Sequence, residues 1–365
     1  MKKSILKTKS FKVKALIILT FTVSYLPAYS LFHALSQPTN DSLAAKTAEW
    51  ARDNHLGFIV TNLEKIQYKL NPVKVGGNTK VSKLANNSGT NLPISLPTIV
   101  NPPLTLEGKY QSVVSKDNIP VISVAMLRPD RLHTSYLTSV AYINLNYAKI
   151  EQHPGLLDPG NKINWGTLPK ISQANNSGYI AAFNSGFRLK DSMGGYYQNN
   201  HLLGKMTPNS ASFIIYKDGR VAIKKWQASD VITNDISSIR QNIAPLILNG
   251  KVNIDINKNV YYKWGATVSS NYAVWRSGIG IDKFGNLIYA TGDALSAASL
   301  ANILLRAGSV NAMELDINAD WTSFYYYTQG IHNSLLLSHK INNFSRPNNR
   351  YFYNSSRDFF AVKLK

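Results

Sequence analysis

Short runs of β-branched and aromatic residues, separated by turn residues, recur from about residue 107 to the C-terminus. Such runs predict strands, because these side chains pack well on a pleated, half-buried surface. One stretch differs: residues 296–307 place Leu300 and Leu304 at helical spacing and end before Gly308, a typical helix stop. This order predicts an α+β fold, with one large mixed, mostly antiparallel sheet and a few flanking helices. The strands are predicted at residues 110–115, 121–127, 135–145, 179–183, 211–216, 220–226, 274–281, 287–291, 310–315 and 358–364.

The N-terminus carries a targeting signal. Six lysines lie within the first fourteen residues and precede an uncharged run, residues 15–35. A basic flank before a short apolar stretch is typical of a secretory signal peptide, with a small-residue cleavage site at residues 28–30 or 34–36. With its polar interruptions the run also reaches the ~20 residues that span a bilayer, so an uncleaved membrane anchor stays an alternative. Both interpretations predict an exported protein of the periplasm, cell envelope or exterior, in contact with the membrane if the segment is retained.

The rest of the chain divides by composition. Asn40-Asp41-Ser42 offers the N-cap of a helix that Gly57 would end, and a short strand is predicted at residues 58–61. Residues 71–103 are rich in Pro, Gly, Asn and Ser, which is typical of a linker or a long surface loop. The predicted parts are a signal peptide or anchor at 1–36, a small helical module at 37–70, the linker or loop at 71–103 and a main domain at 104–365.

Charge and cysteine content exclude several functional classes. The chain has no Cys, which excludes disulfides, thiolate-bound zinc, iron–sulfur clusters and a cysteine nucleophile. With 40 Lys and Arg against 20 Asp and Glu, the formal net charge is +20, and Arg346, Arg350 and Arg357 lie near the C-terminus. Outside a cell, such a surface attracts anionic lipids and sugar-phosphate polymers. Because no nucleic-acid-binding motif accompanies the charge, no specific nucleic-acid partner is predicted.

Two carboxylates stand at the end of the last strand of a strand–helix–strand unit. Glu314 and Asp316 are two residues apart, so on a strand they share a face, and their repulsion separates their pKa values into an acid and a base. The alternative is that they cap the next loop or pair with Lys or Arg. The spacing Asp316-x-Asn318-x-Asp320 lacks the later Gly and Glu of a helix–loop–helix calcium site. No cofactor is expected, although a divalent cation at an all-oxygen site stays an alternative and the metal requirement is left open.

Two further segments carry polar groups next to predicted strands. The strand at residues 179–183 runs into Asn184, Gly186 and Arg188, and so delivers an amide and a guanidinium to a loop. In the second segment, Arg276 lies in an apolar strand and is followed by glycines that would let a ligand approach the backbone. An Arg at this place grips a phosphate by two parallel hydrogen bonds.

A structural interpretation of Arg276 stays equally open. Its guanidinium would then pair with a carboxylate of the same region, either Asp293 or Glu314. Sequence spacing alone does not separate this interpretation from phosphate binding.

These blocks, in this order, resemble the phosphodiester glycosidase family over about residues 105–365. The third block, which begins at Leu315, departs from the family pattern, because the family's three glycines and Ser after the Asp are absent here. The resemblance implies a site built from Asn184, Arg276 and Asp316. The matching blocks are Asn184-Ser185-Gly186-Phe187, Arg276-Ser277-Gly278-Ile279-Gly280 and Leu315-Asp316-Ile317-Asn318-Ala319-Asp320.

The resemblance implies an exported hydrolase that cleaves the bond between a sugar anomeric carbon and phosphate in a glycan or glycolipid phosphodiester. Phosphate is a good leaving group, so one carboxylate and one Arg suffice in principle. The alternative is a non-catalytic envelope module that binds a phosphate-bearing polysaccharide. The predicted roles are Arg276 as phosphate clamp, Asp316 as base or nucleophile, Glu314 as its assistant, Asn184 as a sugar contact, and Gly186, Arg188 and Asn318 as further binding residues.

Overall fold

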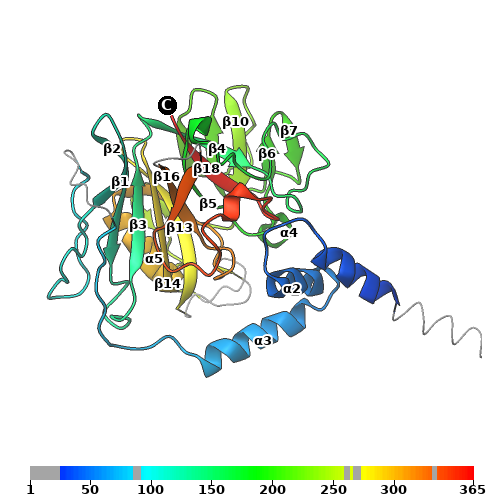
Figure 1. Cartoon of the computed structure of the whole chain (residues 1–365), viewed down its shortest axis with the longest axis horizontal. Helices are drawn as coiled ribbons and strands as arrows, with labels where there is room; N and C mark the ends of the chain where they lie inside the picture. The colour runs from blue at the N-terminus through cyan, green and yellow to red at the C-terminus, as the bar shows by residue number, and fades with distance from the viewer. Residues whose placement is uncertain (1–24, 85–91, 259–263, 266–272, 331–334) are drawn as a thin grey trace, which may run out of the picture. The chain divides into compact units, whose positions relative to one another are not determined.

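The computed structural model describes residues 25–84, 92–258, 264–265, 273–330 and 335–365 (Figure 1). The chain divides into two compact units, Met1–Glu64 and Lys65–Lys365. The boundary falls within helix α3 (Gly57–Leu70).

The first unit is helical. Residues 25–35 are helical, and α2 (Leu43–Asp53) begins at the predicted N-cap, where Ser42 Oγ accepts a hydrogen bond from the Ala45 N–H at 3.1 Å. Gly57 begins α3 instead of ending a helix, and the strand predicted at residues 58–61 is wrong, because these residues lie inside α3. A run of four residues, one aromatic and three β-branched, is too short to separate a strand from one turn of a longer helix.

Most of the predicted signal peptide or anchor lies outside the described residues, which begin at residue 25. Within the described part of the chain, no helix has both the length and the apolar character needed to cross a bilayer.

The second unit contains three sheets in place of the single large sheet predicted, and every strand pair described in them is antiparallel. The predicted combination of mostly antiparallel strands with few helices is therefore confirmed. The eight-stranded sheet has the order β1 (Gln111–Lys116), β2 (Ile119–Leu127), β3 (Thr138–Ile143), β14 (Leu287–Leu295), β13 (Val274–Asp282), β15 (Ser309–Glu314), β11 (Pro245–Leu248) and β12 (Lys251–Val252).

Two five-stranded sheets complete this unit. One has the order β17 (Leu336–Lys340), β16 (Phe324–Gln329), β5 (Tyr179–Asn184), β18 (Phe359–Leu364) and β4 (Ala148–His153). The other has the order β7 (His201–Leu203), β6 (Tyr196–Gln198), β10 (Ile236–Gln241), β8 (Ala211–Tyr216) and β9 (Val221–Lys225). Short helical segments occur between strands, namely α4 (Leu189–Ser192) and the 3₁₀ turns Asn175–Ser177 and Arg350–Phe352.

Helix α5 (Ala297–Arg306) connects β14 to β15, and both strands flank β13 (Figure 1). The predicted strand–helix–strand unit is therefore present, with an antiparallel strand between its two strands. Ser296 caps the helix by accepting from the Ser299 N–H at 3.0 Å, while Ser299 Oγ accepts from the Ser296 N–H at 2.9 Å. In β13, a Cβ at Gly280 would lie 2.0 Å from Ser309 Oγ, so this glycine makes room for β15 and not, as predicted, for a ligand.

Two cores hold the layers together. One face of the eight-stranded sheet packs against the two smaller sheets through side chains such as Ile122, Phe183, Phe213 and Phe360. The opposite face is covered by α5, whose buried Leu300, Ile303 and Leu304 have the predicted helical spacing. Burial of these apolar faces is the main stabilising contribution to such a layered fold.

The segment predicted as a linker or loop carries no helix or strand in its described parts, but it is attached to the sheet unit. The Gly76 N–H donates to the Leu132 carbonyl at 2.6 Å, and the Leu96 N–H donates to the Gly108 carbonyl at 2.8 Å. Leu96 is buried and belongs to the α5-side core.

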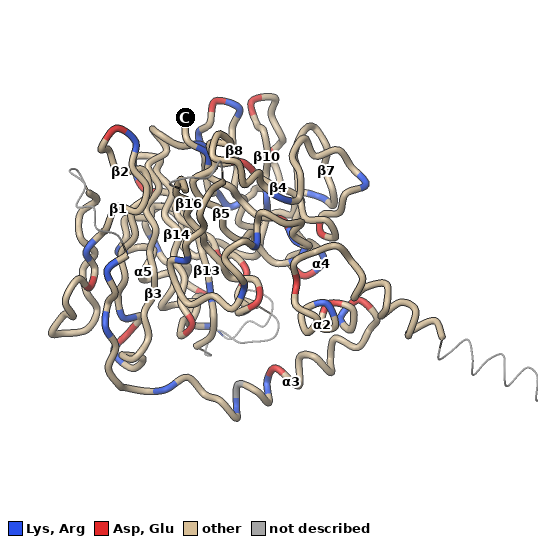
Figure 2. The backbone as a smooth tube through the Cα atoms, viewed as in Figure 1, with Lys and Arg blue, Asp and Glu red and all other residues tan. Residues whose placement is uncertain are grey.

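Charged residues are spread over many loops and strand ends of the sheet unit, and the basic ones do not gather on one helix (Figure 2). The positive charge of the chain therefore acts as a general attraction for anions.

Candidate active site

The three segments that carry the predicted site residues lie side by side. Asn184 Nδ2, at the end of β5, donates to Ser277 Oγ of β13 at 2.9 Å. That hydroxyl donates to the Asp316 carbonyl, just after β15, at 2.8 Å. The Asp316 N–H in turn donates to the Ser185 carbonyl at 3.0 Å. Residues distant in the sequence are thus joined by one continuous hydrogen-bond network.

Asn184 is the centre of this network. Its Oδ1 accepts from the Tyr289 hydroxyl at 2.9 Å and from the Ser323 N–H at 3.0 Å. Its Nδ2 donates to the Ser185 carbonyl and to Ser277 Oγ, both at 2.9 Å. A side-chain amide offers two donors and two acceptor lone pairs, and all four are used here in a buried position. This geometry favours a structural role over the predicted contact with a sugar.

Arg276 and Glu314 form a completely buried ion pair. Arg276 Nη1 donates to Glu314 Oε1 at 2.5 Å, and both side chains are fully inaccessible to solvent. The guanidinium also donates to the carbonyls of Leu295 at 2.9 Å and Trp264 at 3.1 Å. Of the two carboxylates considered from the sequence, Glu314 and not Asp293 is the partner. Complete burial does not favour the predicted contact of Arg276 with a substrate phosphate.

Burial raises the pKa of Glu314 to about 7, against the opposing effect of the Arg276 guanidinium. The nearby charge of Asp316 raises the pKa further, although by less than burial does. Glu314 Oε2 has no hydrogen-bond partner among the described residues. Glu314 therefore acts on the site only through its charge and its backbone, whose carbonyl accepts from Asn242 Nδ2 at 2.7 Å.

Asp316 follows β15 and is fixed from several sides. Its Oδ1 accepts from the Ile317 N–H at 2.8 Å, and its Oδ2 pairs with Arg357 Nη1. Its carbonyl accepts from the hydroxyls of Ser277 at 2.8 Å and Thr322 at 3.1 Å. The strand ends at Glu314, so strand alternation does not extend to Asp316, and the two predicted carboxylates pair with different arginines.

Three arginines surround one indole ring near Asp316. The guanidinium carbons of Arg357, Arg350 and Arg346 lie 3.9, 5.5 and 6.0 Å from the centre of the Trp321 ring. All four side chains are buried. We call these four residues the Trp321 cluster. Arg357 pairs with Asp316, so the cluster places three guanidinium groups near one fixed carboxylate, and guanidinium groups are well suited to bind a phosphate.

Arg357 is the residue that sequence reasoning missed. It lies 41 residues from Asp316 and belongs to no motif. The available signal is the group of arginines near the C-terminus, which from the sequence alone indicates only a basic surface. In the structure, the backbone of Arg357 forms a parallel bridge with Asp158, a half-buried residue whose carboxyl pKa is raised by burial.

A second buried ion pair lies near this segment. Arg240 Nε donates to Asp358 Oδ2 at 2.7 Å, and the Arg240 guanidinium also donates to the Phe187 carbonyl. Arg240 thereby links β10 to the start of β18 and to the loop after β5. It holds the backbone on either side of the candidate site in place.

Gly186 lies where two segments approach closely. A Cβ at this position would lie 2.9 Å from the Asn242 Cγ atom. Asn242 Oδ1 accepts from the Phe187 N–H at 3.4 Å, so the loop after β5 rests directly on the Asn242 side chain. The role of Gly186 in this structure is close packing, and its predicted contact with substrate stays a prediction.

The remaining predicted residues form local contacts. Arg188 is buried, and its Nε donates to Asp191 Oδ2 at 2.8 Å within the turn that begins α4. Asn318 Oδ1 accepts from the Asp320 N–H at 2.8 Å and so closes the loop after Asp316. Their predicted roles in substrate binding stay predictions. Among the described residues, no group of three or more His, Asp or Glu side chains is placed to hold a metal ion.

Comparison with known proteins gives one family match. Residues 171–343 match the model of the phosphodiester glycosidase family, a span that includes Asn184, Arg276, Glu314 and Asp316. No curated protein matches the chain significantly.

Several solved structures are similar. One is the catalytic domain of zebrafish N-acetylglucosamine-1-phosphodiester alpha-N-acetylglucosaminidase auto-inhibited by its pro-peptide, with 15% identity, 70% of this chain and 88% of that chain covered, and a TM-score of 0.44. A second is a hypothetical protein from Synechocystis, with 12% identity, 66% and 64% coverage and a TM-score of 0.34. A third is a putative exported protein from Burkholderia pseudomallei, with 8% identity, 62% and 74% coverage and a TM-score of 0.28.

The resemblance predicted from the three sequence blocks is thus confirmed, because residues 171–343 match the model of the phosphodiester glycosidase family.

Proposed function

We propose that this chain is an exported hydrolase that cleaves the bond between a sugar anomeric carbon and phosphate in a phosphodiester of the cell envelope or an extracellular glycan. The observation that carries the proposal is the Asp316 carboxylate, fixed beside Arg357 and the Trp321 ring, within the segment that matches the family.

The reaction makes modest demands on the protein. Water bonds to the anomeric carbon, the carbon–oxygen bond to phosphate breaks, and the electron pair leaves on the phosphate oxygen. The departing phosphomonoester has a second pKa near ~6, so it leaves without strong protonation. The site must therefore stabilise positive charge on the sugar and negative charge on the phosphate.

We assign to Asp316 the role at the anomeric carbon, because its carboxylate is held in a fixed orientation beside Arg357. As a base it takes the proton of the attacking water, and as a nucleophile it forms a glycosyl ester that water then hydrolyses. Its hydrogen bond from the Ile317 N–H fixes the carboxylate orientation in either mechanism. Glu314 is a positioning residue, because it is completely buried and acts through its charge.

Arg357 takes the phosphate role predicted for Arg276. Its guanidinium contacts both the Asp316 carboxylate and the Trp321 ring, and so lies between the proposed base and the remaining arginines of the Trp321 cluster. A bound phosphate would exchange part of the Arg357–Asp316 contact for its own hydrogen bonds, which frees the carboxylate for reaction.

Export rests on the sequence. The six N-terminal lysines and the uncharged run at 15–35 direct the chain out of the cytoplasm, where sugar-phosphate glycans and glycolipids are the available anionic substrates. If the segment is retained, it anchors the protein to the membrane.

The test uses the full-length chain and a methyl 1-phosphodiester of N-acetylglucosamine or glucose in heavy-oxygen water. Cleavage at the anomeric carbon places the heavy oxygen in the released sugar. Label found only in the phosphate would show phosphorus–oxygen cleavage and would refute the proposed bond.

A second candidate is a binding module without activity. One observation favours it: both oxygens of the Asp316 carboxylate are already engaged, by the Ile317 N–H and by Arg357. Saturable binding of the same phosphodiester, without release of sugar and unaffected by Asp316→Asn, would support the module.

A further inference from the structure

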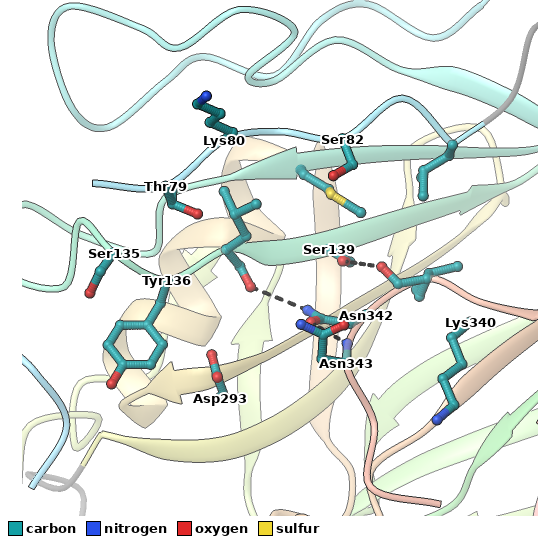
Figure 3. Close-up of a pocket in the computed structure, with 14 residues that line it drawn as sticks. Thr79, Lys80, Ser82, Ser135, Tyr136, Ser139, Asp293, Lys340, Asn342 and Asn343 are labelled. Atoms are coloured by element: carbon teal, nitrogen blue, oxygen red, sulfur yellow. Dashed lines mark hydrogen bonds between the residues drawn. The ribbon is translucent and has the colours of Figure 1, made fainter. Parts of the chain in front are cut away.

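A polar cavity of ≈ 370 Å³ lies at the end of the eight-stranded sheet where β3 begins and β14 ends (Figure 3). Its volume is within the range of small-molecule sites, about 300–1,000 Å³. Five parts of the chain line it: residues 79–84, Met126 of β2, residues 135–139, Asp293 of β14 and residues 340–343. No residue of the candidate active site lines this cavity.

Asp293 is the distinctive group of the cavity. Its side chain lies between Tyr136 and the pair Asn342 and Asn343 (Figure 3). It is half-buried, and burial raises its pKa. Within the described parts of the chain no side chain or backbone group of another residue hydrogen-bonds or pairs with this carboxylate. A partly desolvated carboxylate without a partner is costly, which favours a ligand that donates hydrogen bonds to it.

The other side chains that line the cavity indicate what kind of ligand would fit it. Ser135 Oγ is buried and has no hydrogen-bond partner among the described residues, so a further donor or acceptor is available. Lys80 and Lys340 also line the cavity and disfavour a cation, while Asp293 disfavours an anion. Hydroxyls, two amide side chains and one phenol ring together fit an uncharged ligand rich in hydroxyl groups, with an apolar face for Tyr136.

The cavity lies close to the candidate active site. Gly292, which precedes Asp293, is paired with Arg276 across β14 and β13, and β15 with Glu314 is the next strand. Two strand spacings correspond to roughly 10 Å. The cavity and the loop after β15 are therefore near enough to contact different parts of one extended ligand.

We propose that this cavity is a carbohydrate subsite that holds one neutral sugar unit of a glycan chain next to the unit that is cleaved. The Asp293 carboxylate accepts hydrogen bonds from sugar hydroxyls, Ser135 Oγ adds a further hydrogen bond, and the Tyr136 ring lies against the sugar face. This inference rests on the proposed function and narrows its substrate from a small phosphodiester to an oligosaccharide or polymer.

The test compares two substrates on the full-length protein: the methyl 1-phosphodiester of N-acetylglucosamine and the same ester of triacetylchitotriose, in parallel with glucose and maltotriose esters. Asp293→Asn keeps the shape of the side chain and breaks no described ion pair. We expect it to raise KM for the trisaccharide ester about tenfold, with kcat unchanged, and to leave the monosaccharide ester unaffected. Asp117→Asn, in the exposed turn between β1 and β2, is the matched control and changes neither.

A binding measurement separates this inference from the proposed function. By calorimetry, free triacetylchitotriose or maltotriose binds the full-length protein, and Asp293→Asn weakens this binding about tenfold. If such binding is found but no ester is cleaved, the subsite stands and the hydrolase proposal fails. If esters are cleaved but Asp293→Asn changes neither KM nor binding, or if only inorganic phosphate binds in the cavity, the subsite is refuted.

Discussion

Replacing Asn184 by Ala is expected to destabilise the fold severely, because the amide joins four partners in the centre of the molecule. The substitution removes four hydrogen bonds, to Ser185, Ser277, Tyr289 and Ser323. At about 1 kcal/mol each, their loss amounts to about 4 kcal/mol. The buried Ser323 N–H is left without this acceptor, which adds about 1–3 kcal/mol. The expected loss is therefore about 5–7 kcal/mol, a large part of the stability of a typical domain.

The assay is equilibrium unfolding in urea, followed by tryptophan fluorescence, with the slope of the transition compared between variants. Tyr289→Phe removes a single bond and should cost about 1 kcal/mol, and its effect should be coupled to that of Asn184→Ala in a double-mutant cycle. Asn302→Ala, on the exposed side of α5, is the control and should stay within about 0.5 kcal/mol of wild type. An Asn184→Ala protein that is as stable as wild type, yet has a raised KM, would refute this reasoning and restore the predicted sugar contact.

Three further predictions concern buried groups around the site. Asp358→Ala leaves the Arg240 guanidinium buried without its partner and should cost about 3–5 kcal/mol in unfolding experiments; a loss below 1 kcal/mol would contradict the described pair. The folded pKa of Glu314, about 7, lies above the usual value of 4.5, so its contribution to stability is complete below about pH 4.5 and is lost as pH rises through 7. Glu314→Gln should therefore gain stability relative to wild type, by up to about 3 kcal/mol, between these pH values, and a pH-independent difference would show that the pKa is not raised. Gly186→Ala should lower the free energy of unfolding by about 1–3 kcal/mol, because the added Cβ would lie too close to Asn242. An unchanged melting temperature would show that the loop after β5 moves away from Asn242 without strain.

Local patterns predicted the elements whose signals are local. Helix α5 has both its cap at Ser296 and its stop at Gly308, where φ is +96°, so its bounds differ from the prediction by one residue at each end. Strands β8 and β13 are rich in β-branched side chains and lie within one residue of their predicted bounds. Strands such as β10, with the sequence ISSIRQ, were missed because polar residues interrupt the alternation and only the neighbouring strands define them.

The sequence indicated which segments come together at the candidate site, but not which hydrogen bonds and ion pairs their side chains make there. The order of the three blocks identified the segments that meet around Ser277, although β5 belongs to a five-stranded sheet and β13 and β15 to the eight-stranded sheet. Whether Arg276 binds phosphate or Glu314 depends on burial, which sequence spacing does not determine. The pairing of Asp316 with Arg357 joins a loop to the start of β18 and has no local signal, since one Arg among several carries no information about its partner.

The most direct test of the account is the rate of sugar release after separate replacement of Asp316 by Asn and of Arg357 by Gln. Each variant is expected to keep a cooperative unfolding transition and to lose at least about 100-fold in kcat/KM on a sugar 1-phosphodiester. Wild-type kcat/KM in either folded variant would contradict the assignment of the reacting site.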